Sequence, residues 1–76
     1  MDIDGLRQRW NKQARLHFLD GEVVDALILD VDPIDADFTF EVLRIVSADP
    51  QGAVSSEVGQ TYVTKLATLK AWEPVD

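Results

Sequence analysis

A run of strand-forming residues at 15–32, RLHFLDGEVVDALILDVD, constrains the fold more than any other part of this chain. Apolar side chains recur at every second position on both sides of a single interruption, Asp20-Gly21. This is the periodicity of strands with one buried face. An Asp-Gly pair between two such runs favours a hairpin with a two-residue type I′ turn, in which both residues take positive φ angles. The chain is therefore expected to build a sheet around this hairpin, whose second strand runs to about Val31.

The sequence after the hairpin predicts a turn and a bent third strand. Pro33 lies among four aspartates within residues 30–37, which favours a solvated turn because proline lacks the backbone donor that a strand needs. A strand is expected from about Phe38, and its apolar positions shift by one residue at Val42-Leu43. Such a shift predicts a β-bulge, which lets a long strand bend.

The C-terminal part of the chain predicts two further strands. Residues 48–59 contain a proline, two glycines and no sustained periodicity, which indicates a loop. Residues 60–66 and 69–73 are expected to form strands, separated by one 3₁₀ turn at 66–68 and ended by Pro74.

The residues before the hairpin predict a short amphipathic helix. Asp2 or Asp4 can serve as its N-cap, and apolar positions then recur three and four residues apart, as one helical face requires. The members of this face are Ile3, Leu6, Trp10 and Ala14. The helix is therefore expected over about 3–13, with Trp10 as its main contact with the sheet.

Length and composition limit the class of protein. A chain of 76 residues encloses one hydrophobic core, so we expect a single domain over 1–76. It has no cysteine, which excludes disulfides and thiolate metal sites. No apolar run approaches the roughly 20 residues of a membrane-spanning helix, and the N-terminal sequence MDIDGLRQRW lacks the pattern of a secretory signal. The sequence therefore predicts a cytoplasmic protein with no membrane partner.

The net charge of −7 is unevenly distributed along the chain. Residues 1–16 carry four basic and two acidic side chains, whereas residues 17–76 carry three basic and twelve acidic ones. An acidic body repels phosphate backbones, so the charge argues against DNA and disfavours RNA. Any RNA contact is expected to use the N-terminal segment, where Arg7 and Lys12 lie off the apolar stripe of the predicted helix.

No pattern in the sequence predicts a catalytic residue, a cofactor or a metal site. His17 is the single histidine, so it has no second histidine with which to hold a transition metal. The aspartates of residues 30–37 suggest calcium, but this segment lacks the glycine and the ligand spacing of an EF-hand loop. We therefore expect a protein that is not an enzyme, and cation binding by the acidic turn is the weakest of three functional hypotheses.

The expected layout resembles the small SH3-like barrels, and among these the Sm-like branch. The first Sm motif has a hydrophobic strand, a turn ending in glycine, alternating residues around a small one, and then an aspartate. The residues that match it are Leu19, Asp20, Gly21, Val24, Ala26, Ile28, Val31 and Asp32. The asparagine that follows in RNA-binding members is absent from residues 33–37, and Thr64-Lys65 stands where their second motif has an arginine-glycine pair. The overall pattern is similar to uncharacterised bacterial Sm-like proteins, a resemblance that implies a fold and no activity.

Together these features predict a mainly β fold, in which an N-terminal α-helix precedes a five-stranded, strongly bent antiparallel SH3-like (Sm-like) barrel over about 15–74. The leading functional hypothesis is a non-catalytic interaction module that binds another protein or itself, through an exposed strand edge or the region of Trp72. Trp72 is expected either to pack under the helix with Trp10 or to lie at an interface. The alternative is a divergent Sm-like RNA-binding subunit of a homo-oligomer. The candidate contact residues are Asp32, Lys65, Trp72, Arg7 and Lys12.

Overall fold

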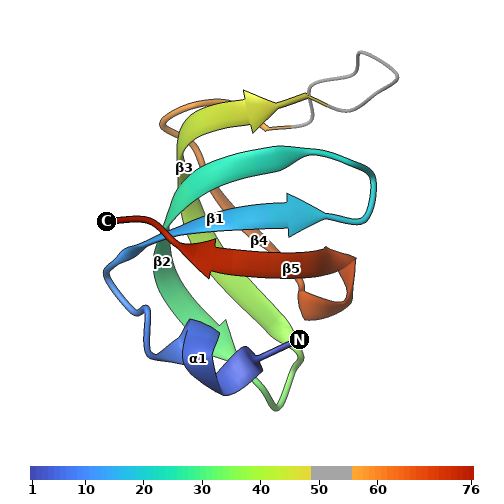
Figure 1. The fold of residues 1–76 in the computed structure, drawn as a ribbon. Helices are drawn as coiled ribbons and strands as arrows, with labels where there is room; N and C mark the ends of the chain where they lie inside the picture. Colours follow the sequence, from blue (N-terminus) through green and yellow to red (C-terminus); the bar gives the residue numbers. More distant parts are fainter. Residues whose placement is uncertain (49–55) are drawn as a thin grey trace.

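The computed structural model describes residues 1–48 and 56–76, which form one short α-helix and five strands (Figure 1). The elements are α1 (Ile3–Arg7), β1 (Gln13–Phe18), β2 (Val23–Asp32), β3 (Asp37–Ser47), β4 (Thr61–Lys65), the 3₁₀ turn η1 (Leu66–Thr68) and β5 (Leu69–Pro74). The strands form one antiparallel sheet in the order β4-β3-β2-β1-β5. The predicted mainly β architecture and its 3₁₀ turn are confirmed. Of the predicted loop at 48–59, residues 49–55 lie outside the described residues.

The sheet is bent but open. β4 and β5 are its edges, and within the described chain they do not pair with each other, so the closed SH3-like barrel stays a prediction. The long strands β2 and β3 curve strongly (Figure 1). Asp25 pairs with Arg44 and Ala26 pairs with Val42, which leaves Leu43 as an extra residue of β3. The predicted bulge at Val42-Leu43 is therefore confirmed.

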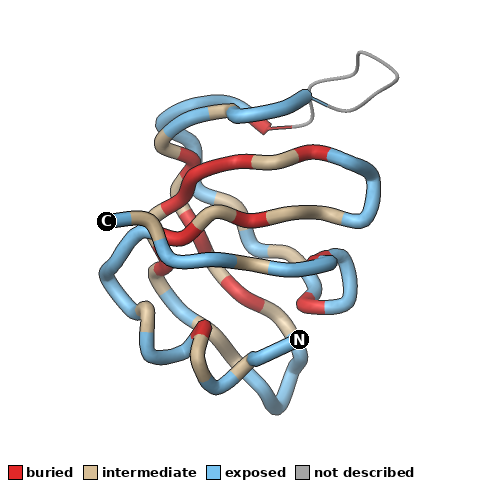
Figure 2. Tube along the Cα trace, in the orientation of Figure 1, coloured by how far each residue is buried: buried red, intermediate tan, exposed pale blue. Residues whose placement is uncertain are grey.

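One face of the bent sheet carries the hydrophobic core. Side chains at alternate positions of the central strands point to this face, and burial is concentrated along these strands while the edge strands are mostly exposed (Figure 2). The buried apolar residues are Leu6, Ala14, Leu16, Val24, Ala26, Ile28, Phe38, Phe40, Val42, Leu66 and Leu69. Side chains from α1 and η1 thus complete a core that the strands alone leave open.

The opposite face of the central strands holds a buried carboxylate between two arginines. Asp25 is paired in register with Arg15 on β1 and with Arg44 on β3. Its Oδ1 accepts a hydrogen bond from Arg15 Nε at 2.8 Å, and its Oδ2 lies 2.9 Å from Arg44 Nη2. The hydrogen bond from Arg15, supported by both positive charges, holds the pKa of Asp25 below its usual range, although burial acts in the opposite direction. We call these three residues the Asp25 cluster.

The first hairpin differs from the predicted type I′ turn. Phe18 N–H donates to the carbonyl of Glu22 at 2.9 Å, and Gly21 N–H donates to the carbonyl of Phe18 at 3.0 Å. The hydrogen bond between Phe18 and Glu22 therefore encloses residues 19–21, and of these only Gly21 has a positive φ, of 96°. This is a turn with a glycine bulge. Asp20 has a negative φ, and its side chain accepts the N–H of Glu22 at 2.9 Å.

The predicted helix over 3–13 is too long, because α1 ends at Arg7. Beyond it, Asn11 takes a φ of 61° and donates its N–H to the carbonyl of Ile28 at 2.7 Å. Pairing with β2 thus replaces the last turns of the predicted helix. Trp10 is consequently 67% exposed and does not anchor the helix to the sheet.

Trp72 occupies the position under α1 that was expected of Trp10. Its indole Nε1 donates to the carbonyl of Asp2 at 2.8 Å, and its ring lies so close to Gly5 that a Cβ there would be 2.9 Å from it. Asp2 caps α1 as predicted, since its side chain accepts the N–H of Gly5 at 2.8 Å. No helix in the described part of the chain has the length and hydrophobicity needed to span a membrane.

Candidate binding groove

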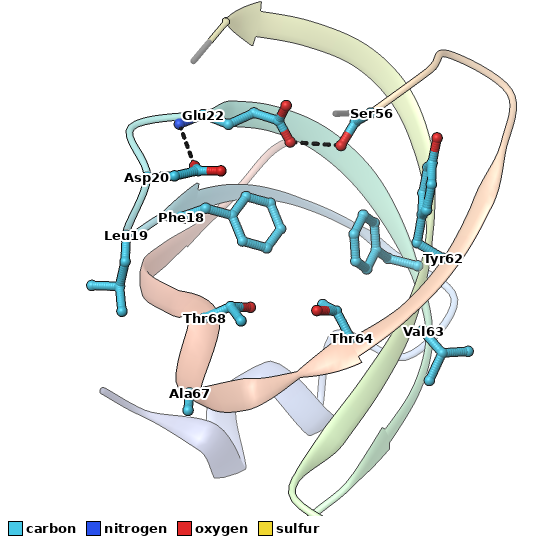
Figure 3. A pocket seen from close by; sticks show the side chains of 11 residues that line it. Phe18, Leu19, Asp20, Glu22, Ser56, Tyr62, Val63, Thr64, Ala67 and Thr68 are labelled. Atoms are coloured by element: carbon cyan, nitrogen blue, oxygen red, sulfur yellow. Dashed lines mark hydrogen bonds between the residues drawn. The ribbon is translucent and has the colours of Figure 1, made fainter. Parts of the chain in front are cut away.

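A groove with a volume of about 500 Å³ lies beside the first hairpin (Figure 3). It is bounded by the connection between β1 and β2, by β3 and β4, and by η1. The bend of the sheet brings these segments together although they are far apart in the sequence. The volume is within the range of roughly 300–1,000 Å³ that is usual for ligand sites. The groove can therefore accept a side chain of a partner.

Aromatic rings form the inner wall of the groove. Phe40 and Tyr62 are paired in register on β3 and β4, and their ring centroids are 5.9 Å apart. The ring of Phe18, from β1, lies 5.8 Å from that of Phe40. Phe40 is buried, whereas Phe18 and Tyr62 are half-buried and line the groove. A ligand in the groove would therefore meet parts of both of these rings.

Two carboxylates border the aromatic wall. Asp20 is exposed in the hairpin loop, and Glu22, only 3% exposed, accepts a hydrogen bond from the hydroxyl of Ser56 at 2.6 Å. Figure 3 shows both acids on the same side of the groove, above the ring of Phe18. Among the described residues that line the groove there is no lysine, arginine or histidine. The groove therefore combines an apolar wall with negative charge.

Exposed aliphatic side chains flank the groove. Leu19 in the hairpin and Val63 on β4 border it, with the Val63 side chain directed away from the aromatic wall (Figure 3), and each remains 66% exposed. β4 is an edge strand, so its outer side pairs with no other described strand. Unpaired strand edges can accept a further strand. The groove thus lies next to a potential site of strand addition.

Two of the predicted contact residues, Asp32 and Lys65, lie together but outside the groove. The Oδ1 atom of Asp32 accepts the N–H of Asp35 at 3.1 Å and that of Ile34 at 2.9 Å. The bond from Asp35, then that from Ile34, with a smaller effect of the Lys65 charge, lowers the pKa of Asp32. Lys65 Nζ donates to the carbonyl of Asp35 at 3.3 Å. Asp32 therefore stabilises the turn after β2, and Lys65 connects this turn to the end of β4.

The other predicted contact residues do not join a common site. Trp72 packs under α1, and Arg7 lies 4.0 Å from Asp4 in an exposed ion pair. Lys12 is exposed, and its carbonyl accepts the N–H of Ile28 at 3.0 Å. Arg7 and Lys12 are therefore surface residues of the N-terminal segment, and neither lines the groove.

The groove has no separate signal in the sequence, because the residues of its wall carry the pattern of core residues. Phe18 and Phe40 occupy alternating positions of predicted strands, where apolar side chains usually belong to the core. The available signal was Glu22, an acidic residue directly after the hairpin glycine and before a run of apolar residues. A carboxylate at that position is buried only with hydrogen-bond partners, and Ser56 supplies one of them from beyond β3.

Within residues 1–48 and 56–76, no three His, Cys, Asp or Glu side chains lie together in a way that could hold an ion. His17 Nε2 lies 3.0 Å from Glu73 Oε1 on the neighbouring strand.

Comparisons of the chain with protein-family models, with curated proteins and with solved structures find no significant match.

Proposed function

We propose that this protein is a non-catalytic interaction module, a small barrel-like domain that binds an extended segment of another protein. The observation that carries the proposal is the unpaired edge of β4 beside the groove, with the exposed Val63 at the rim. The Sm-like resemblance agrees with the use of this edge, because that resemblance implies self-association through the fourth and fifth strands.

Binding would use the backbone and the groove together. A strand added to a sheet edge gains main-chain hydrogen bonds, and pockets for alternate side chains supply the specificity. Edge strands that avoid such pairing usually carry charged residues or proline. β4 has an uncharged centre, Tyr62-Val63-Thr64, with its single charge at Lys65. The sequence of this strand therefore leaves the edge suitable for pairing.

A binding role fits the groove better than catalysis. The hydroxyl of Ser56 lies next to Glu22, but a serine nucleophile needs a base that is itself oriented and donors that stabilise the developing oxyanion. The single histidine, His17, is paired with Glu73 and does not line the groove. We therefore propose that the described lining residues recognise a ligand without transforming it.

The proposal is tested by site-specific photo-crosslinking in cells. A crosslinker at Val63 should capture a defined protein, whereas one at Ile34, which is 92% exposed in the turn after β2, should not. With the purified partner, Val63→Asp should weaken binding at least about tenfold, while Ile34→Asp should change it less than about twofold. Equal capture at both positions, or full affinity of Val63→Asp, would contradict the proposal.

The second candidate function is that of a divergent Sm-like RNA-binding subunit of a homo-oligomer. The observation that favours it is the proximity of Asp32 and Lys65, the two residues nearest to the nucleotide contacts of that family. The acidic charge opposes it. Salt-sensitive binding of uridine-rich RNA that Lys65→Ala weakens would favour this function, and a chain that ignores such RNA at low salt would eliminate it.

A further inference from the structure

We propose that the groove recognises a basic side chain, a lysine or arginine of the partner segment. Its alkyl part would lie along the rings of Phe18 and Tyr62, and its charged head would lie beside the carboxylates of Asp20 and Glu22. This inference rests on the proposed function, since it specifies the partner that binds beside β4.

The composition of the groove wall selects an amphipathic ligand. The rings of Phe18, Phe40 and Tyr62 form a continuous series with neighbouring centroids 5.8 and 5.9 Å apart. Lysine and arginine side chains pack their methylene groups against such apolar surfaces and keep the charged head at the margin. A cation close to an aromatic face gains a further attraction from the ring electrons. A short polar side chain would leave the rings uncovered.

The charges of the groove select a cation. Asp20 and Glu22 lie on one side of the aromatic wall, and no described lining residue carries a positive charge. The acidic body around them, with twelve acidic and three basic side chains in residues 17–76, strengthens the negative potential. Acidic or phosphorylated ligands are therefore repelled, whereas a basic segment is attracted during its approach.

The two carboxylates would contact the ligand in different ways, because Asp20 is exposed and Glu22 is buried. Asp20 is exposed in the hairpin loop and can reach a ligand head from the solvent side, while it also accepts the N–H of Glu22. Glu22 is held by the Ser56 hydroxyl, so its position is fixed before a ligand arrives. A fixed carboxylate loses little conformational freedom on binding.

The test uses the full chain and four extended host peptides that differ only in a central lysine, arginine, norleucine or glutamate. Amide shifts in NMR titrations should change at Phe18, Glu22, Tyr62 and Thr68 for the lysine and arginine peptides. The norleucine peptide should bind at least about tenfold more weakly, and the glutamate peptide should not bind. Added salt should weaken the basic peptides selectively.

Matched variants test whether the carboxylates of Asp20 and Glu22 contribute to binding. Asp20→Asn and Glu22→Gln should each weaken the lysine peptide about threefold to tenfold and leave the norleucine peptide unchanged. Asp30→Asn removes the same charge from an exposed position that does not line the groove, and should have little effect. Asp20→Asn keeps the inference falsifiable even if Glu22→Gln disturbs folding, since Asp20 is exposed.

The outcomes separate this inference from the proposed function. If the norleucine peptide binds at the groove as tightly as the lysine peptide, the basic ligand is wrong while strand binding beside β4 stands. If none of the four peptides shifts the groove amides, the basic ligand is again overturned. The proposed function fails as well if crosslinkers at Val63 and Ile34 capture the partner equally, or if Val63→Asp leaves the cellular partner bound.

Discussion

The Asp25 cluster should be one of the main polar sources of stability in this domain. Asp25 is buried and paired directly with Arg15 and Arg44 across three strands. We expect Asp25→Asn to fold but to lose stability, because the amide keeps the shape of the side chain and removes its charge. Its one carbonyl oxygen can accept from only one of the two guanidinium groups, and its NH₂ group would face the other.

The size of the effect follows from the exposure of the partners. Hydrogen bonds to charged groups contribute about 1.5–3 kcal/mol, but the Arg44 side chain is 65% exposed, so its pair resembles a surface salt bridge. The substitution should therefore cost about 2 kcal/mol in the free energy of unfolding. For a domain of this size that corresponds to a fall in Tm of roughly 10 °C.

The pH dependence gives the sharper test. The pKa of Asp25 is lower in the folded state than its usual value of 3.8, so in acid the unfolded chain takes up this proton first. The stabilisation is therefore complete above that usual value and is lost as the pH falls through the lower, folded pKa. In urea unfolding, the difference between wild type and Asp25→Asn should be constant from about pH 7 to 5 and should shrink below about pH 4.

Two results would refute this reasoning. A difference that stays constant into strong acid would mean that Asp25→Asn acts through packing and not through the ion pairs. A destabilisation no larger than that of Asp30→Asn, an exposed control on the same strand, would mean that the pairs contribute nothing. Such surface substitutions usually change stability by less than about 0.5 kcal/mol.

Two further substitutions test the first hairpin and the packing of α1 against Trp72. Gly21→Ala places a side chain at a φ of 96° and should cost about 1–2 kcal/mol in chemical unfolding; unchanged stability would contradict the glycine bulge in the hairpin. Gly5→Ala would place its Cβ 2.9 Å from the Trp72 ring and against the capping carboxylate of Asp2. In a Trp10→Phe background it should destabilise the domain by about 1–3 kcal/mol and shift the Trp72 fluorescence to longer wavelength; an unshifted spectrum would contradict this packing.

The features that the sequence predicts correctly are those that local periodicity controls. The slip of the apolar pattern at Val42-Leu43 identifies the extra residue of β3, because a one-residue insertion moves the following side chains to the other face. The 3₁₀ turn at Leu66–Thr68 and the end of β5 at Pro74 follow from equally local signals. The alternation of residues in each strand likewise identifies most of the core.

The wrong predictions fail where a distant segment overrides a local preference. Residues 8–13 carry helical periodicity, but Asn11 pairs with Ile28 and draws this segment onto β2. Trp72 lies 62 positions after Trp10 and takes the site under α1 that the helical pattern gave to Trp10. Helix propensity over so short a segment is weak compared with tertiary contacts. The groove was missed for a related reason, since Glu22 and Ser56 meet only after the sheet has bent.

The Asp25 cluster and the groove depend on the same strand register. The bulge at Leu43 places Arg44 opposite Asp25, and the neighbouring pairing places Arg15 opposite the same residue on β1. With β1, β2 and β3 fixed in this way, Phe18 and Phe40 come within 5.8 Å on the core face. A slip of one residue in this register would turn the rings away from the groove, and it would also separate Asp25 from the two arginines. A buried carboxylate that tolerates only one register therefore also selects the arrangement in which the groove exists.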